Sequence, residues 1–550
     1  MKQYPMYYRF YAFLLHNPLT KTMTLRVRSK YELICPAREQ YIVQRTVSTI
    51  GIAWLSVFLE IMIVLSLNHG IVQTMIAIAL GMIVHNEVIA FQSRHLEEKI
   101  LQQFEQFISE VRHYYYVSEM IDEAIFDAMD HTSYEMRIHA QKLYDIITSD
   151  HYEELAEQYY LSTHNTFFHL MLSLCITVLE YGDRTIGKQS LFIMNLSNLK
   201  TEVNIELLKL KQINYLYAGL TFVILSPMTL LKAIEHWAVS NLPELNSFYH
   251  SGLGAVTAIL IIGSSLLLYL TVGELRESRI NRGSHHLVLE QFLQCRWVHK
   301  CIDHYIQRFQ LRMQRLQTRI DASCEVVQLR DVVGMKFLDA CCGATLVTIM
   351  SIFFIIRDHE RYDWYELVLA ILTARLCFMI PDIRLLFHRK LAVMGREEEI
   401  IQYQSIVLML MYIERISVLE ILERIEEFSY IFRKPIQNCI NDYNASDMDA
   451  LEKMKQETRF LPFQRFVDNL MISDEIGIER AFDEIAADRE YFQEKRKQEN
   501  EMNLNRRYEI SKFIAYIPAI LVIGAYLILP FLIECYRQLN EYREIMNTLY

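Results

Sequence analysis

Long apolar segments alternate with charged, helix-patterned segments along this chain. A run of about 20 mostly apolar residues is long enough to cross a bilayer as a helix. Between such runs, apolar residues recur at helical spacing and strand signals are scarce, so the pattern predicts an all-α polytopic membrane protein with large soluble segments. We identify seven spans, near 47–67, 71–91, 213–233, 252–273, 337–356, 365–381 and 513–533.

The order of these segments occurs twice, which indicates an internal repeat. In each half a hairpin of two spans precedes a soluble segment and then a further span. The stretch "FEQFISEVRHYYYVSEMIDEAIFDA" from Phe104 aligns with "YQSIVLMLMYIERISVLEILERIEE" from Tyr403. In both, a Val/Ile–Ser step precedes a second amphipathic helix. Further along, "IGKQSLF" (186–192) matches "IGIERAF" (476–482).

The repeat defines the expected domain organisation, in which each soluble segment folds as a helical bundle and the basic stretch between the halves forms one long helix or a helical pair. The expected parts are a basic N-terminal segment (1–45), a transmembrane hairpin (46–92), a first bundle (93–211), two transmembrane helices (212–274), a basic linker (275–336), a second hairpin (337–384), a second bundle (385–510), the last span (511–534) and a C-terminal tail (535–550).

The distribution of charge predicts the topology. Residues 1–45 contain eight Lys or Arg residues and two acidic residues. Residues 235–251 contain no Lys or Arg, and residues 274–336 contain eleven Lys or Arg residues. Because basic loops stay in the cytoplasm, the N-terminus and both bundles are expected there. The net charge of −11 and the lack of a clustered basic footprint argue against nucleic-acid binding. The ten cysteines show no disulfide spacing and are expected to be reduced thiols.

One stretch imitates a nucleotide-binding motif. Gly182, Gly187 and Lys188 have the spacing of a phosphate-binding loop, but Gln189 stands where a Ser or Thr must hold magnesium. The matching "IGIER" has no lysine, and no strand–helix alternation surrounds either copy. We therefore interpret Gly187 and Gly477 as turns between bundle helices. No catalytic motif occurs elsewhere, so we expect neither an enzyme nor a cofactor.

Two charged residues lie within predicted spans. Charges at membrane depth are costly and are functional candidates by default. Glu60 lies deep in the first span, where contact with an intramembrane partner and simple bonding between helices are equally plausible explanations. Arg375 lies six residues before Pro381, so snorkelling to the cytoplasmic edge explains it better.

Prolines interrupt two spans, at Pro227, Pro518 and Pro530. Each frees a backbone carbonyl, which is tolerable where neighbouring groups satisfy it. Such kinks either are simply tolerated in lipid or shape a groove for a translocating helix.

Cys295, His299, Cys301 and His304 form two pairs on different sides of a helix, so no metal site is expected.

Two stretches carry a family resemblance. "LCFMIPDIRLLFHRK" (376–390) ends a span with Pro381 and Asp382 at the membrane edge and then turns basic, and "YEISKFIAYIPAILVIGAYLILPFLI" (508–533) is the last span. This layout resembles the inner-membrane platform proteins of type II secretion (the F domain), type IV pilus and especially Tad-type pilus assembly, over 46–235 and 337–534. The first hairpin lacks a proline at the position of Pro381, so the second half is the better match and the first half resembles a divergent copy of it. The whole chain therefore resembles two platform proteins fused into one.

The resemblance implies a non-enzymatic role in the inner (cytoplasmic) membrane. Such platforms contact a cytoplasmic hexameric secretion ATPase and couple its motion to extraction of pilin subunits from the membrane, working as oligomers. The alternative is a transporter or channel built from two repeats. That alternative predicts inverted repeats, whereas both repeats here have the same orientation and the soluble bundles occupy nearly half the chain.

Overall fold

The computed structural model divides the chain into two compact units. Unit 1 comprises Met1–Leu216, Ile401–Phe428 and Pro435–Glu501, and unit 2 comprises Tyr217–Ile400, Ser429–Lys434 and Met502–Tyr550. The structure describes residues 6–34, 39–67, 71–163, 165–183, 185–186, 189–249, 252–276, 296–322, 329–341, 399–411, 416–429, 431–443, 446–458, 460–483 and 489–549, together with isolated positions between 371 and 396. Helices account for nearly all of these residues, as the sequence predicts.

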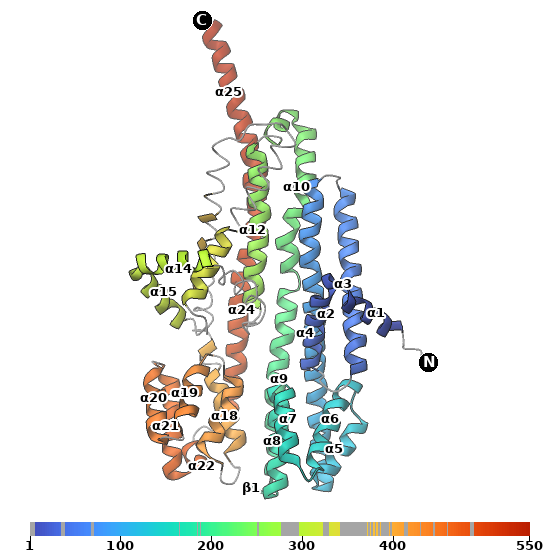
Figure 1. The fold of residues 1–550 in the computed structure, drawn as a ribbon, viewed down its shortest axis with the longest axis vertical. Helices are drawn as coiled ribbons and strands as arrows, with labels where there is room; N and C mark the ends of the chain where they lie inside the picture. The colour runs from blue at the N-terminus through green and yellow to red at the C-terminus, as the bar shows by residue number, and fades with distance from the viewer. Residues whose placement is uncertain are drawn as a thin grey trace. The chain divides into compact units, whose positions relative to one another are not determined.

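Unit 1 begins with two short helices packed on a long hairpin. These elements are α1 (Met6–His16), α2 (Pro18–Ile34), α3 (Glu39–Leu67) and α4 (Ile71–Ser118). The antiparallel pair α3 and α4 is drawn in blue in Figure 1. The 48 residues of α4 run without a break from the apolar hairpin into the soluble bundle.

The first bundle follows on from α4. Its further helices are α5 (Ile121–Asp130), α6 (Tyr134–Ile147), α7 (Tyr152–Ser162), α8 (Thr166–Tyr181) and α9 (Leu191–Tyr217). The α4 helix stops where Glu119 adopts a positive φ of 53°. The Asn165 side chain caps α8 by accepting the Phe167 N–H at 3.0 Å. In the core, the rings of Phe104 and Phe168 lie 4.4 Å apart.

The second bundle has helices of closely similar length in the same order. They are α18 (Val418–Phe428), α19 (Arg433–Tyr443), α20 (Asp447–Glu457), α21 (Leu461–Ile476), α22 (Ile478–Ala481) and α24 (Arg489–Leu521). Both α7 and α20 have 11 residues, and both α8 and α21 have 16. Ser417 and Glu420 form a capping box at the start of α18, each side chain accepting the other's backbone N–H at 3.2 Å.

Unit 2 contains the remaining apolar helices. They are α10 (Leu220–Asn241), a 3₁₀ turn (Pro243–Leu245), α11 (Asn246–Tyr249), α12 (Gly252–Arg276), a π-helical turn (Val522–Ile528) that continues α24, and α25 (Leu529–Leu549). Residues from α10, α11, α12 and the π-helical turn share one apolar core. Within the expected basic linker (275–336), the described residues include a helical pair, α14 (Arg296–Arg308) and α15 (Gln310–Ala322).

Four helical stretches of the described chain are long and apolar enough to cross a membrane. They are Glu39–Ser66, Ile76–Ser118, Leu191–Asn241 (α9 with α10) and Gln493–Arg543. The expected span 252–273 corresponds to α12, whose apolar part Leu260–Gly273 is shorter than the four candidate spans. The expected spans 337–356 and 365–381 lie largely outside the described residues. The described residues are therefore almost entirely helical, and the four candidate spanning helices among them are consistent with a membrane protein.

Candidate functional site

The hairpin α3–α4 encloses the carboxylate of Glu60. Both its oxygens are buried and have no hydrogen-bond partner among the described residues. Opposite them lies Gly81 of α4, where an added Cβ would stand 3.1 Å from Val57 Cγ1 and 3.4 Å from Glu60 Oε2. One turn further along α4, the buried His85 likewise has an unpaired Nε2. Two uncompensated polar side chains thus occupy a candidate membrane hairpin, where polar groups are rare and usually functional.

The Gly81 position offers a test of this close packing. A leucine there must displace Val57 and Glu60, so we expect Gly81→Leu to lower the free energy of unfolding by about 1–3 kcal/mol. Gly51→Leu is the matched control, because no atom lies within 4 Å of a Cβ built at Gly51. Thermal unfolding of both variants in lipid nanodiscs measures the difference. Equal melting temperatures would show that the hairpin does not need a glycine.

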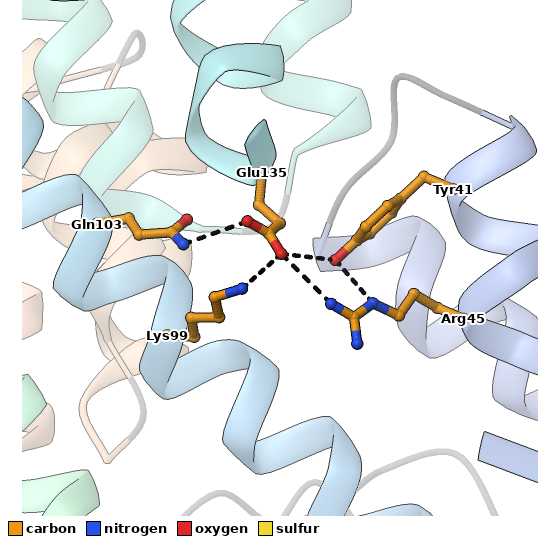
Figure 2. Close-up of polar contacts among 5 residues, drawn as sticks. All are labelled: Tyr41, Arg45, Lys99, Gln103 and Glu135. Carbon is orange, nitrogen blue, oxygen red and sulfur yellow. Dashed lines mark hydrogen bonds and ion pairs between the residues drawn. The ribbon is translucent and has the colours of Figure 1, made fainter. Parts of the chain in front are cut away.

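A polar cluster joins the part of this hairpin beyond its apolar runs to the first bundle. Figure 2 shows the Glu135 carboxylate of α6 between Lys99 and Gln103 of α4 and Tyr41 and Arg45 of α3. Lys99 Nζ lies 2.7 Å from Oε1 and Gln103 Nε2 donates to Oε2 at 3.2 Å. The Tyr41 hydroxyl donates at 3.3 Å and the Arg45 guanidinium at 3.4 Å. Three helices therefore meet on one carboxylate.

The cluster holds Glu135 in its charged form. Burial alone would raise the pKa of Glu135, but the hydrogen bonds from Lys99, its own backbone and Gln103, together with the Lys99 charge, lower the pKa to about 2. A carboxylate that is nearly buried and surrounded by donors is a rigid connection, because losing any donor leaves part of its charge unsatisfied.

A buried ion pair joins the two bundles within unit 1. Arg496 of α24 donates to the Glu202 carboxylate of α9, and the side chains are only 1% and 3% exposed. The residues are 294 positions apart and lie in different bundles. Breaking such a pair on one side is strongly destabilising, because the remaining charge has no water to solvate it.

A second contact between the bundles surrounds His169 of α8. Its Nδ1 lies 2.8 Å from the Glu427 carboxylate of α18, and its Nε2 lies 2.7 Å from the Thr163 carbonyl oxygen. A carbonyl only accepts, so Nε2 donates to Thr163. Beside this pair, the Arg424 guanidinium stands 4.8 Å from the ring centre of Tyr160. The first and second bundles thus pack together through charged and aromatic side chains.

In unit 2, an ion pair joins the two ends of the expected second hairpin (337–381). Lys336 Nζ lies 2.7 Å from Asp382 Oδ1 and 5.6 Å from the ring centre of Phe378. Lys336 and the neighbouring Pro381 are buried. The Pro381–Asp382 step therefore has a structural partner in Lys336. Arg375 is helical and exposed.

Hydroxyl groups compensate two of the three span prolines. Pro227 has no N–H for the Val223 carbonyl, and the Ser226 hydroxyl donates to that carbonyl at 3.2 Å. Pro530 likewise leaves the carbonyl of Tyr526 without its α-helical donor, and the Tyr249 hydroxyl donates to it at 2.9 Å. All three prolines, including Pro518, are buried, so their rings face protein rather than lipid.

The π-helical turn between Pro518 and Pro530 also has polar contacts to α10. The Tyr526 hydroxyl donates to Glu235 Oε2 at 2.9 Å, and Lys232 Nζ lies 2.6 Å from Oε1 of the same carboxylate. Single π-helical turns are frequent at functional sites. An apolar cavity of about 260 Å³ opens beside this turn, and a second of about 220 Å³ continues from Trp237 and Leu527. Together they form a groove lined mainly by Ala233, Ile234, Trp237, Leu242, Leu245, Val522, Ile523, Leu527, Ile528 and Phe531.

The structure describes only one of the two expected Ile–Gly turns. Gly477 has a φ of 88° and connects α21 to α22. Gly187 lies outside the described residues, although two-residue strands flank it, Thr185–Ile186 paired with Gln189–Ser190. Its turn was expected between helices, so these short strands are a local difference from that expectation.

Gly182 has the backbone conformation that matches Gly477. It ends α8 with a φ of 74°, and its N–H bonds to the Val178 carbonyl four residues back, as Gly477 does with Ser473. The turn presents Asp183, whose carboxylate accepts the Phe192 N–H at the start of α9 and the Tyr115 hydroxyl, both at 3.1 Å. The glycine of the phosphate-loop-like stretch therefore performs a structural task.

Two buried thiols of the described chain are held in their protonated form. Burial raises the pKa of the Cys175 thiol to about 12, and burial with nearby carboxylates raises that of Cys439 to about 11. Both are free cysteines. No metal-binding group of three or more His, Cys, Asp or Glu occurs in the part of the chain that the structure describes. Cys295 lies outside that part.

Sequence reasoning missed Glu135, Glu202 and Arg496. A signal existed for Glu202, which adjoins the apolar stripe that includes Leu199 and Val203, all of them buried. Charges on such a face suggest a buried partner. Neither the identity of its partner, Arg496, nor the position of Glu135 among three helices follows from local pattern.

Comparison with known protein families, curated proteins and solved structures finds no match.

Proposed function

We propose that this chain is an inner-membrane platform protein of a Tad-like type IV pilus or type II secretion-type machine. It couples a cytoplasmic hexameric secretion ATPase to the extraction and assembly of pilin subunits, without enzymatic activity of its own. The observation that carries the proposal is the repeated helix order, with 16-residue α8 and α21 each ending on a positive-φ glycine before a long helix into the membrane. This agrees with the tandem bundles that the sequence resemblance implies.

The contacts between the bundles support a coupling role. A platform must pass force between an ATPase outside the membrane and a substrate within it, so its soluble part has to move as a body. The buried Glu202–Arg496 pair and the His169–Glu427 contact tie the two bundles together. The Glu135 cluster ties the first bundle to α3 and α4. Rigid elements with few joints transmit displacement without loss.

The groove in unit 2 suits the proposed substrate. Pilin subunits enter assembly as apolar helices, and the groove beside the π-helical turn is apolar along its length. Pro518 and Pro530 flank the turn, which favours the interpretation that these prolines shape the groove over the interpretation that they are only tolerated in lipid.

We place seven spans in the membrane, with a cytoplasmic N-terminus, and we expect the protein to act as a homo-oligomer.

The end of α4 is the surface we assign to the ATPase. Tyr116, Val117 and Met120 are exposed apolar residues at the α4–α5 turn, with Val117 76% exposed. This turn lies 26 residues beyond the apolar run 71–91, roughly 40 Å along the helix. Exposed apolar side chains at such a distance from the membrane are typical of protein-binding sites.

The test is co-purification of the tagged full-length protein from membranes of the native cell. We expect a hexameric secretion ATPase to be recovered, and Val117→Asp to lower its recovery about tenfold, the effect of losing one central apolar contact. Ile476→Asp, an exposed position on the second bundle, is the matched control and is expected to retain binding. Recovery of no ATPase, together with solute movement by the protein in liposomes, would establish the transporter alternative instead.

A further inference from the structure

The N-terminal helix α1 packs against the first apolar run of α3. In Figure 1, α1 crosses the long helix α3. The ring of Phe10 packs edge-on against Trp54 with centroids 6.2 Å apart. Trp54 is seven residues into the apolar run 47–67, which is roughly 10 Å along the helix. Helices that lie in the membrane interface insert about 5–10 Å below the head groups, which is the depth this contact gives α1.

One side of α1 faces protein and another is exposed and aromatic. Tyr11 and Leu14 are buried, and Arg28 of α2 donates to the Tyr11 hydroxyl at 2.9 Å. Phe10 and Phe13 are exposed, Phe13 by 60%, and their rings stack with centroids 6.4 Å apart. Two stacked phenylalanines in water would be unfavourable, whereas at a lipid boundary they are stabilising.

Cations accompany these aromatic residues. Arg9, Lys21 and Arg26 are exposed, and none of them forms an ion pair with a carboxylate in the described part of the chain. Arg28 differs, because it pairs with Glu32 at 2.5 Å and Glu39 at 3.7 Å. The exposed Met23 and Leu25 of α2 alternate with the free cations. Basic residues interspersed with exposed apolar ones are the composition of helices that bind anionic membrane surfaces.

We propose that α1 and α2 form a surface anchor that binds anionic phospholipids in the leaflet at the N-terminal end of α3. Phe10 and Phe13 insert among the acyl chains, while Arg9, Lys21 and Arg26 contact phosphate head groups. The anchor fixes the depth of α3 in the bilayer, and through α3 it fixes the position of Arg45 in the Glu135 cluster. It depends on the membrane position of α3 and not on which protein the bundles bind.

The test uses the full-length protein in nanodiscs with equal amounts of phosphatidylcholine and phosphatidylglycerol. The photo-crosslinking residue p-benzoylphenylalanine replaces Phe13, and mass spectrometry identifies the adducts. We expect phospholipid adducts in which phosphatidylglycerol exceeds phosphatidylcholine about fivefold or more, the preference that one nearby cation provides. The matched control is the same replacement at Tyr116, an exposed aromatic residue of the bundle, which is expected to give no lipid adduct.

A variant with Arg9→Gln, Lys21→Gln and Arg26→Gln tests the cations. These residues are exposed, so the variant is expected to fold, and its lipid ratio at position 13 should fall to about one. An unchanged ratio in this variant would overturn the head-group contacts. Adducts to protein alone, or no adduct at position 13, would overturn the anchor.

Discussion

Replacing Arg496 with leucine is expected to lower the free energy of unfolding by about 3–5 kcal/mol. The substitution leaves the Glu202 carboxylate buried with no cation beside it, and neither side chain is accessible to water. Thermal unfolding in lipid nanodiscs, followed by circular dichroism, measures the loss. Because the pair connects α9 to α24, limited proteolysis should also cleave the second bundle faster in the variant.

A double variant separates charge from packing in this prediction. In Arg496→Leu with Glu202→Leu no charge remains buried, and apolar replacements of a buried ion pair are often neutral or stabilising. We therefore expect the double variant to recover most of the lost stability. If single and double variants unfold at the same temperature, the contribution of Arg496 is its packing and not its charge.

Acid is expected to loosen the connection between α3 and the first bundle through Glu135. The pKa of Glu135 is about 2 in the folded protein against 4.5 for an unperturbed carboxyl, which corresponds to roughly 3 kcal/mol. A lowered pKa means that this stability is fully present above pH 4.5 and is lost as the pH falls toward 2. Melting temperatures measured from pH 7 to pH 2.5 should show this decline.

The variant Glu135→Gln removes the titration. Its melting temperature at pH 7 is expected to be below that of the unaltered protein, because glutamine cannot match the charge of Lys99 and Arg45. Between pH 5 and pH 2.5 it should lose less stability than the unaltered protein. Glu123→Gln, on an exposed position of α5, is the control and should leave both values unchanged. A parallel decline in Glu135→Gln and the unaltered protein would assign the acid sensitivity to other carboxylates.

Periodicity predicted much of this fold because its helices carry strong local signals. The stretch "VLEILERIEE" has apolar residues at helical spacing behind a Ser–Glu capping box, and α18 forms there. The pattern is weaker at α19, where "RKPIQNCINDY" is mostly polar, and local sequence alone does not predict a helix there. Its Pro435 lies in the first turn, where proline is tolerated, and Ile436 and Cys439 supply its buried side.

Contacts between distant residues could not be predicted from such signals. A proline in a span announces a freed carbonyl, but not that Tyr249 reaches Tyr526 across 277 positions. Similarly, the apolar stripe beside Glu202 indicates that this carboxylate is buried, but the helix of Arg496 is rich in charged residues, and only packing identifies Arg496 as the partner. Glu60 is the opposite case, because its position within an apolar run identified it as unusual before any contact was known.

The unbroken length of α4 has a mechanical consequence. At about 1.5 Å per residue, its 48 residues form one continuous helix of roughly 72 Å. A displacement at Val117 is therefore passed along one continuous helix to Gly81, which packs against Glu60 of α3. A force applied at the α4–α5 turn would therefore move the apolar part of α4 next to the Glu60 carboxylate.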